Sequence, residues 1–415
     1  MMMAEKTFLE FFAGIGLVHL GLRSTGWRCV YANDISEKKQ AMYLDEFPDA
    51  SYFHLEDIWQ TENVLERIRQ PALLATASFP CVDLSLAGHM RGLKGEHSSS
   101  LFGFLEVLRR LKAQNKMPPL VMLENVLGLL TGQQGKDFEE TCLALAELGF
   151  WIDAFVVDAK HFTPQSRPRL FIVGVLKEAI PPEGITSFHP LWNERVTARS
   201  HTCPSRLSTA LLKLKLPTGW IAFNLPELPS VQRSLATMID LDDSHDWWSE
   251  AEVVKHFDRM SDLHRLRVEK LMASKQLWVG AMFRRVREGK TKSEVRFDGL
   301  AGCLRTAKGG SGKQIAVVID DGKLKMRWMT PVEYARLQGA PDFNIRRTRN
   351  EALTGFADAV CVPVIDWVAR HVLAPVAAHL GYQTAQAKHS GREQFQLPFD
   401  GLRPAMPVTM AAVPS

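Results

Sequence analysis

Cys81 is the residue whose type and position first suggest covalent chemistry. It follows the apolar stretch Leu73 to Phe79, in a turn where Pro80 restrains the backbone. A thiol held at the end of a strand can act as a nucleophile if its pKa is lowered. A lone cysteine is more often a small buried apolar residue. Cys81 therefore needs chemical partners before it indicates catalysis.

Candidate partners stand beside two later apolar stretches. Glu124 directly follows Leu120 to Leu123, and Arg167 and Arg169 directly precede Leu170 to Val173. Two arginines two residues apart in an extended segment point to the same side. Their guanidinium groups can hold a carboxylate or a phosphate.

A loop with Gly14 and Gly16, between a strand signal and a helix signal, suggests a nucleotide or nucleoside cofactor. Glycines there let the backbone approach a ligand closely. Asp34, at the end of the next predicted strand, can accept hydrogen bonds from ribose hydroxyls. These features alone fit NAD, FAD or S-adenosylmethionine. His19 takes the third glycine position of a dinucleotide fingerprint, which favours a nucleoside cofactor without phosphates.

The elements that must position these residues alternate along the first 175 residues. The predicted strands are Thr7–Phe12, Arg28–Ala32, Leu73–Phe79, Pro119–Leu123, Trp151–Asp158 and Leu170–Val175. The predicted helices between them include Leu17–Leu22, Leu101–Leu111 and Lys136–Leu148. The alternation predicts an α/β fold with a Rossmann-like, doubly wound sheet. Polar residues at the strand ends, including Asp57 with its apolar neighbour Ile58, should then meet at one edge.

The alternation stops near Pro181, and residues 190–325 read as irregular and rich in Trp, His, Arg and Lys. Between Arg284 and Lys313 nine basic residues stand against three acidic ones. A second domain that contacts phosphates is one interpretation. A solvated basic face is the other, and charge alone leaves both open. Helical periodicity returns at Thr330–Gln338 and Ala359–Val372, and the tail 379–415 is predicted to be disordered.

Composition excludes several classes of protein. The 415 residues are 46% hydrophobic and 23% charged, with a net charge of +4, which is ordinary for a globular protein. The most apolar stretch, Val362 to Leu380, contains Asp366 and Arg370 and is typical of an amphipathic helix rather than a membrane span. Six scattered cysteines without a CxxC pair predict no disulfide framework and no structural metal site. A soluble protein in a reducing compartment, the cytoplasm, is expected.

Six motifs in order make the chain resemble the DNA cytosine-5 methyltransferases. They fall within about residues 7–175 and 327–372, and both order and approximate spacing match. The motifs are Phe-Ala-Gly-Ile-Gly at 12–16, Pro-Cys at 80–81, Glu-Asn-Val at 124–126, Gln-x-Arg-x-Arg at 165–169, Met-Thr-Pro-Val-Glu-Tyr-Ala-Arg-Leu-Gln-Gly at 329–339, and Gly-Phe-Ala-Asp-Ala-Val at 355–360.

The resemblance implies a covalent mechanism on a flipped cytosine. Cys81 would attack C6 as a thiolate, and Glu124, in its protonated form, would hydrogen-bond N3 and the amino edge of the base. Arg167 would contact the target base and Arg169 would support the site. S-adenosylmethionine would then donate its methyl group to C5. The base must leave the duplex to enter such a pocket.

The resemblance also assigns the binding residues and the domains. The implied cofactor contacts are Phe12, Gly14, Gly16, Asp34, Ile35, Asp57, Ile58, Pro80, Leu101, Asp358 and Val360. The implied DNA contacts are Ser85, in a loop that closes over the base, and Arg284, Arg285, Arg287, Arg305, Thr306 and Lys308. Residues 1–189 would form the catalytic domain and 190–325 the target-recognition domain. Residues 326–378 would return to complete the catalytic domain.

Several positions depart from the family's common pattern without removing a catalytic group, among them Glu56, which stands where a glycine often precedes the aspartate. Val82 follows Cys81 where glutamine is usual, Asp358 stands where asparagine is common, and Cys303 stands where threonine is frequent. An ionised Asp358 could strengthen contact with a positive charge of the cofactor, or only alter backbone packing. The sequence leaves these two roles open.

A monomeric enzyme acting on double-stranded DNA is the leading hypothesis, from a bacterial nucleoid or a virus, with a cognate restriction nuclease or defence system as a candidate partner. A tRNA cytosine-5 methyltransferase of the same family is the nearest alternative. A nicotinamide-dependent oxidoreductase and a catalytically silent DNA-binding homologue are weaker ones. The missing third glycine argues against the oxidoreductase, and the presence of Cys81 and Glu124 argues against the silent homologue.

Overall fold

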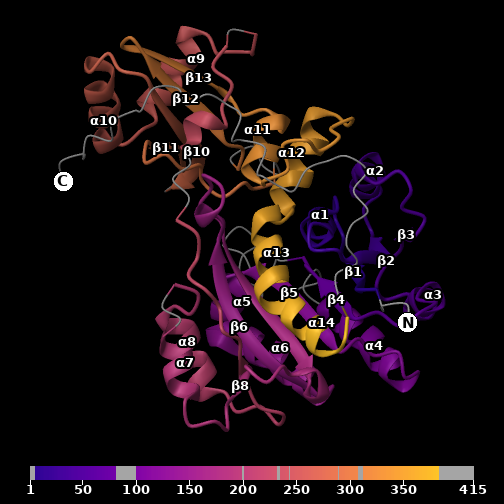
Figure 1. Cartoon of the computed structure of the whole chain (residues 1–415). Coiled ribbons are helices and arrows are strands. Elements are labelled where there is room, and N and C mark those ends of the chain that lie inside the picture. The colour runs from indigo at the N-terminus through magenta and orange to yellow at the C-terminus, as the bar shows by residue number, and fades with distance from the viewer. Residues whose placement is uncertain are drawn as a thin grey trace.

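The structure, a computed structural model, describes residues 5–80, 100–198, 201–230, 234–242, 244–287, 289–306 and 312–382 (Figure 1). Its central sheet has seven strands in the order β3-β2-β1-β4-β5-β7-β6. The strands are β1 (Thr7–Phe11), β2 (Arg28–Asp34), β3 (Phe53–Leu55), β4 (Leu74–Ala77), β5 (Leu120–Val126), β6 (Phe150–Asp158) and β7 (Pro168–Leu176). Neighbouring strands from β3 to β5 are parallel, and β7 is antiparallel to β5 and β6. The predicted doubly wound α/β fold is confirmed.

Helices cover both faces of this sheet because its strands carry apolar residues on both sides. In β1, Phe8 faces one core and Leu9 and Phe11 face the other. The first core includes residues of α1 (Leu17–Arg23), α2 (Glu37–Glu46) and α13 (Val362–Val368). The second includes residues of α3 (Thr61–Arg67), α4 (Ser100–Ala113), α5 (Gly128–Thr131) and α6 (Lys136–Glu147).

The C-terminal helices share a core with one face of the seven-stranded sheet. They are α11 (Pro331–Leu337), α12 (Arg349–Asp358), α13 and α14 (Ala374–His379), and α13 and α14 run along the sheet in Figure 1. A Cβ at Gly21 of α1 would lie 2.6 Å from Ile365 Cβ, so glycine permits this close crossing. The stretch Arg349–His379 is long and apolar enough to cross a membrane, but 72% of its most apolar window is buried inside the protein, as in a core helix.

A second, smaller body contains a four-stranded antiparallel sheet in the order β11-β10-β12-β13. Its strands are β10 (Trp278–Arg287), β11 (Lys290–Arg296), β12 (Ile315–Asp320) and β13 (Lys323–Trp328), and its helices are α9 (Glu250–Asp258) and α10 (Asp262–Ala273). Its own core includes Val268, Met282 and Val317. Regular structure therefore fills much of a region that the sequence left unassigned.

The packing places the domain limits differently from the expected residues 189 and 325. Trp192 of α7 (Trp192–Ala198), Leu207 of α8 (Ser205–Lys213) and Ala222 of β9 (Ile221–Ala222, paired with β8, Ile185–Thr186) are buried in the core of the catalytic sheet. The limit at 325 falls inside β13. Of the tail predicted to be disordered, residues 383–415 lie outside the described part of the chain.

Candidate active site

The site lies at the edge of the sheet where the parallel strands end. The loop Phe12–Gly16 follows β1, Asp34 ends β2, Ser78 follows β4 and Glu124 lies near the end of β5. Because β7 runs in the opposite direction, its first residues reach the same edge, where Arg169 pairs in register with Val126. The predicted convergence of polar strand ends is therefore present.

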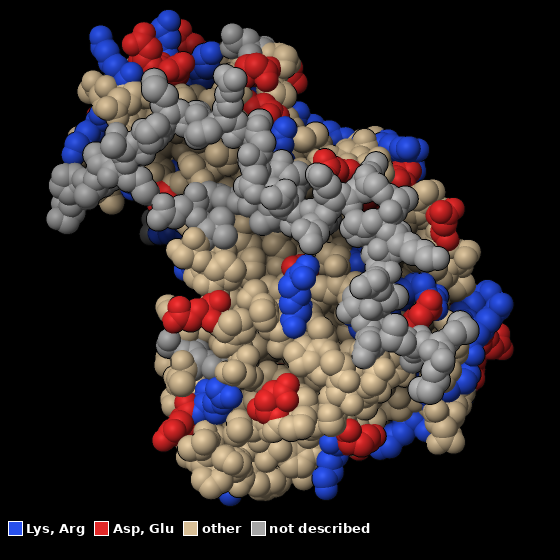
Figure 2. All heavy atoms as spheres, in the orientation of Figure 1, with Lys and Arg blue, Asp and Glu red and all other residues tan. Residues whose placement is uncertain are grey.

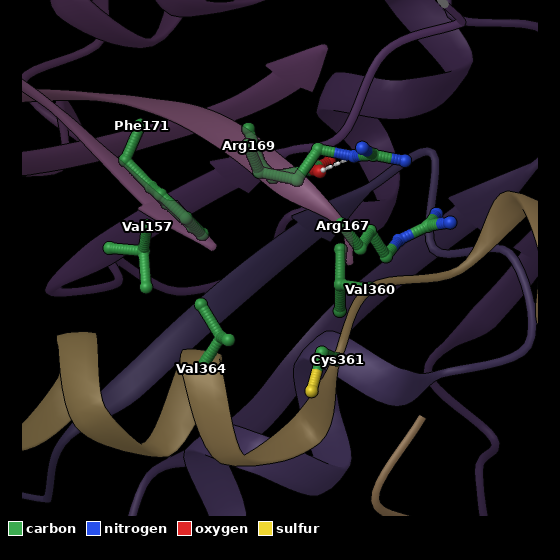
Figure 3. A pocket seen from close by; sticks show the side chains of 8 residues that line it. Val157, Arg167, Arg169, Phe171, Val360, Cys361 and Val364 are labelled. Atoms are coloured by element: carbon green, nitrogen blue, oxygen red, sulfur yellow. Dashed lines mark ion pairs between the residues drawn. The ribbon is translucent and has the colours of Figure 1, made fainter. Parts of the chain in front are cut away.

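Glu124 and Arg169 form an ion pair at this edge. Arg169 Nε lies 3.0 Å from Glu124 Oε1, and the two side chains are only 14% and 9% exposed (Figure 3). A carboxylate this deeply buried requires a charged or hydrogen-bonding partner. Arg169 supplies that partner and fixes the position of the carboxyl group.

Arg167 has a different environment. It is 2% exposed, and its guanidinium donates to the carbonyl oxygens of Leu304 at 3.2 Å, Ala357 at 3.0 Å and Ala359 at 2.5 Å. Arg167 thus joins β7 to two segments more than 130 positions later in the chain. Figure 3 shows both arginines pointing toward the same side, but Arg169 is the one that contacts Glu124.

Cys303 lies between the two arginines. Its Sγ is 3.3 Å from Arg167 Nη1 and 3.9 Å from Arg169 Nη2. Burial alone would raise the pKa of this thiol, but the positive charges of Arg167 and Arg169 outweigh burial and lower the pKa. The cysteine that replaces a common threonine therefore meets two cations beside Glu124.

Gln165 of the same motif fixes the backbone around the arginines. Its side-chain Nε2 donates to the Leu337 carbonyl at 2.9 Å, and its Oε1 accepts from Leu304 N at 3.3 Å. It is fully buried, so these bonds satisfy a polar group that water cannot reach. The 301–304 segment is thereby held against β7 and α11.

A pocket, called the loop pocket below, lies beside the Phe12–Gly16 loop. Its empty volume, which includes space open to solvent, is about 390 Å³. The loop takes a left-handed backbone at Gly14 (φ +58°) and Gly16 (φ +84°), and a Cβ at Gly16 would lie 2.6 Å from the Phe47 ring. The lining residues are Phe12, Ala13, Gly14, Ile15, Leu17, Val18, Lys39, Ser78, Gly355, Asp358, Ala359 and Val360.

The predicted cofactor residues divide into three groups. Phe12, Gly14, Asp358 and Val360 line the loop pocket. Asp34 braces the loop, since its Oδ2 accepts from Gly14 N and its Oδ1 from Ser36 N, both at 2.9 Å. The others do not line the loop pocket: Gly16 ends the loop, Ile35 is 70% exposed, Asp57 and the buried Ile58 follow β3, Pro80 is exposed, and Leu101 is fully buried in the core.

Sequence reasoning missed Lys39, Ser78 and Gly355 in the loop pocket. Gly355 stands in a motif that was noticed, and Ser78 adjoins another. Lys39 lies on α2 outside every motif, and at the site its Nζ lies 2.9 Å from Asp358 Oδ2.

A buried polar network lies beneath the loop. Tyr43 Oη donates to Glu10 Oε2 at 3.1 Å and lies 2.8 Å from His19 Nδ1, and His19 N donates to Glu10 Oε1 at 3.1 Å. Burial raises the pKa of Glu10 to about 8 and lowers the pKa of His19 to about 3. Glu10, His19 and Cys29 are metal-ligand types with atoms within 4.8 Å of one another, but Glu10 and His19 are already bonded within this network.

The predicted DNA contacts are spread over different surfaces. Arg285 and Arg287 are exposed on β10 and both pair with Glu294 of β11, at 2.8 and 3.0 Å. Arg284 instead stacks on Trp328, with its guanidinium carbon 4.8 Å from the ring centre. Arg305 is exposed and Thr306 half-buried, two and three positions after Cys303. In Figure 2 basic and acidic side chains are interspersed over the second body.

Three of the predicted site residues, Cys81, Ser85 and Lys308, lie outside the described residues, as does Val82. The described site thus consists of the Glu124–Arg169 pair, the loop pocket and the Arg167 anchor. Val360 borders both the loop pocket and the cavity beside Glu124 and Arg169.

The doubly wound sheet has the Rossmann-like methyltransferase fold. The family model for C-5 cytosine-specific DNA methylases matches residues 6–374, and the chain belongs to that family. It is an enzyme of this kind that uses S-adenosylmethionine as methyl donor.

Named relatives agree with this family. The Type II methyltransferase M.HpaII of Haemophilus parainfluenzae is 24% identical over 396 residues, covering 88% of this chain and 89% of that protein. The DNA-cytosine methyltransferase of Escherichia coli K12 is 29% identical over 204 residues, covering 41% of this chain and 42% of that protein. The solved S. pombe Dnmt2 methyltransferase shares the fold with a TM-score of 0.56 at 15% identity, covering 90% of this chain and 99% of its own.

Proposed function

We propose that this enzyme methylates C5 of a specific cytosine in double-stranded DNA through a covalent adduct with Cys81. The observation that carries the proposal is the shared border of two sites. Val360 lines both the loop pocket and the cavity beside Glu124 and Arg169. A methyl donor in the first and a flipped base near the second would meet there.

The chemistry divides among the residues of this edge. The Cys81 thiolate adds to C6, and C5 becomes nucleophilic enough to take the methyl group. Loss of the C5 proton and elimination of Cys81 then release 5-methylcytosine. S-adenosylmethionine supplies the electrophilic methyl group and leaves as the neutral thioether. Covalent addition divides one difficult step into easier ones.

Glu124 would hydrogen-bond N3 and the amino edge of the flipped base. The geometry favours Arg169 as the arginine that contacts the flipped cytosine, and Arg167 as the arginine that supports the surrounding backbone. This exchanges the roles expected from the motif alone. The support is that Arg169 lies 3.0 Å from Glu124, whereas Arg167 is engaged with the carbonyls of Leu304, Ala357 and Ala359.

The direct test is bisulfite sequencing of host DNA with and without the expressed gene. Protected cytosines in one repeated sequence context are expected with the wild-type chain and none with Cys81→Ser. Cofactor binding by Cys81→Ser should stay near normal, because the thiol is a nucleophile toward the base. Methylation by Cys81→Ser would contradict the mechanism, and methylation of tRNA without DNA would favour the alternative substrate.

We also propose that the enzyme acts as a monomer on one specific DNA sequence, and that a cognate restriction nuclease accompanies it. The relative M.HpaII is named as a Type II methyltransferase, which supports a role in a restriction-modification pair. Digestion of the methylated DNA with a restriction nuclease that cuts the context found by bisulfite sequencing tests this role. The methylated context found by bisulfite sequencing should block that nuclease.

A further inference from the structure

Lys39 and Asp358 form an ion pair on the wall of the loop pocket. Lys39 comes from α2 and Asp358 is the last residue of α12, and Nζ and Oδ2 are 2.9 Å apart. The side chains are 28% and 37% exposed, so both reach solvent from the wall. Among the described residues that line this pocket, Lys39 is the only base and Asp358 the only acid.

The attachment of α2 to the C-terminal segment does not depend on this pair. Lys38 of α2 pairs with Glu351 at the start of α12 at 3.3 Å, and Arg347 pairs with Asp45 at 2.6 Å. Asp358 also stands at the C-terminal end of α12, where the helix dipole disfavours a negative charge. A purely structural role therefore explains the position of Asp358 poorly.

Three backbone N–H groups of the loop already have acceptors within the protein. The N–H groups of Ala13, Gly14 and Gly16 already donate to Asn33 O, Asp34 Oδ2 and Ala13 O at 2.8 to 2.9 Å. An anion placed in a partly apolar pocket without a cation would lose its hydration at a high cost. Lys39 is the cation that the described pocket provides.

The strand order indicates which end of the cofactor would lie here. Asp34 ends β2, where the ribose is expected, and the predicted adenine contacts follow β3. Since the sheet continues β3-β2-β1-β4, the remaining part of the cofactor would extend over β1 and β4. The loop pocket lies there, between the loop after β1 and Ser78 after β4.

We propose that Lys39 and Asp358 recognise the zwitterionic amino-acid end of the cofactor, with Lys39 binding its carboxylate and Asp358 its ammonium group. This rests on the cofactor placement in the proposed function. A pair of opposite charges matches a zwitterion, and neither charge needs to be buried alone. The asparagine-to-aspartate departure at position 358 and the unexpected Lys39 then have one common explanation.

The test is calorimetric titration of the purified full chain with three ligands. S-adenosylhomocysteine carries both charges, its decarboxylated amine analogue carries only the ammonium, and 5′-methylthioadenosine carries neither. The wild type should prefer S-adenosylhomocysteine over the amine by about 10-fold or more. Lys39→Met should reduce that preference to about 2-fold or less, while its affinity for 5′-methylthioadenosine stays unchanged.

Controls separate recognition from folding. Lys38→Met removes the neighbouring paired lysine and should leave all three affinities unchanged. Lys39→Arg keeps the charge and should keep the preference for the carboxylate. If Lys39→Met does not fold, Asp358→Asn still tests the proposal, because it should lose the preference for the amine over 5′-methylthioadenosine.

Two results would overturn the inference. One is an equal loss of affinity for all three ligands in Lys39→Met, which would indicate a general effect on the pocket. The other is an unchanged preference for the carboxylate in that variant. A wild-type chain that binds none of the three ligands would instead refute the proposed cofactor site itself.

Discussion

Arg167 and Arg169 stand two positions apart in one motif and still have separate tasks. Arg169 neutralises a buried carboxylate at the reaction edge, and Arg167 holds three backbone carbonyls from distant segments. Strand geometry puts both side chains on the same side of β7. Their tasks differ because their partners differ: Arg169 contacts a residue of β5, and Arg167 contacts residues between 304 and 359.

We expect Arg169→Leu to reduce kcat by about 10²-fold, since a charged donor beside the proposed base site is lost. It should also lower the free energy of unfolding, since the buried Glu124 loses its cation. Arg167→Leu should lower the free energy of unfolding by about 3 kcal/mol or more, because buried carbonyls lose a charged partner. Single-turnover methylation and urea unfolding measure the two effects. A stable Arg167→Leu protein with an unfolded Arg169→Leu protein would reverse our assignment.

The pKa of Glu10, raised to about 8 by burial, predicts a pH dependence of stability. Between pH 6.5 and 8 the folded state keeps a proton that an unfolded glutamate has lost. The free energy of unfolding should therefore fall as pH rises, by on the order of 1–2 kcal/mol over that window. Below pH 6.5 the lowered pKa of His19 acts in the opposite direction, so that range is avoided.

Glu10→Gln keeps the shape of the side chain and removes its titration. Urea unfolding of both proteins at several pH values from 6.5 to 8 should show a smaller decline for the variant. Identical declines would mean that Glu10 does not titrate in this window.

At the scale of elements, β10 carries basic residues on both of its faces. Alternation along a strand puts Arg285 and Arg287 on one face and Arg284 on the other, where it stacks on Trp328. The sequence grouped the three as one DNA-binding set because the strand itself was not recognised. Mutations on the Arg285 and Arg287 face should affect DNA binding, and a mutation of Arg284 should affect stability.

Replacing Arg285 and Arg287 together with alanine should weaken DNA binding and reduce the slope of log K against log salt by about 2. Arg284→Ala should mainly reduce stability, through lost stacking. Fluorescence anisotropy over a series of salt concentrations measures the slope. Arg109 and Arg110 of α4, which also pair with carboxylates, provide a matched double-alanine control on the other body. An equal change of slope in that control would mean only a general charge effect.

At the scale of the whole molecule, a buried ion pair connects the second body to the return segment. Arg327 at the end of β13 contacts both carboxylate oxygens of Glu333 in α11, at 2.9 and 2.5 Å, and both side chains are 2% exposed or less. Glu333 also completes the capping box with Thr330 and accepts from Asp240 N at 2.9 Å. Three segments therefore meet at one buried carboxylate.

Arg327→Met should destabilise the protein by about 3–5 kcal/mol, since Glu333 would be left as a buried charge without its cation. The double variant Arg327→Met, Glu333→Met should lose much less than the sum of the two single variants. Urea unfolding followed by tryptophan fluorescence provides the comparison. Additive losses would show that the two side chains contribute independently.

The sequence by itself determined most elements of the first 175 residues, and it determined the family. The alternation of strands and helices predicted the doubly wound sheet, and the order of six motifs identified the family because both signals are local in the chain. It also placed Glu124, the Gly14 loop and Asp34 at one edge, since parallel strand ends must converge there.

Only the tertiary structure decided which residues contact each other at that edge. Glu124 meets Arg169 rather than Arg167, and Lys39 meets Asp358, which lies 319 positions later in the chain. The packing of α7 and α8 on the catalytic core was likewise invisible in the sequence. Such contacts depend on how distant segments pack. A local residue pattern does not indicate which distant residue will lie beside it in the folded protein.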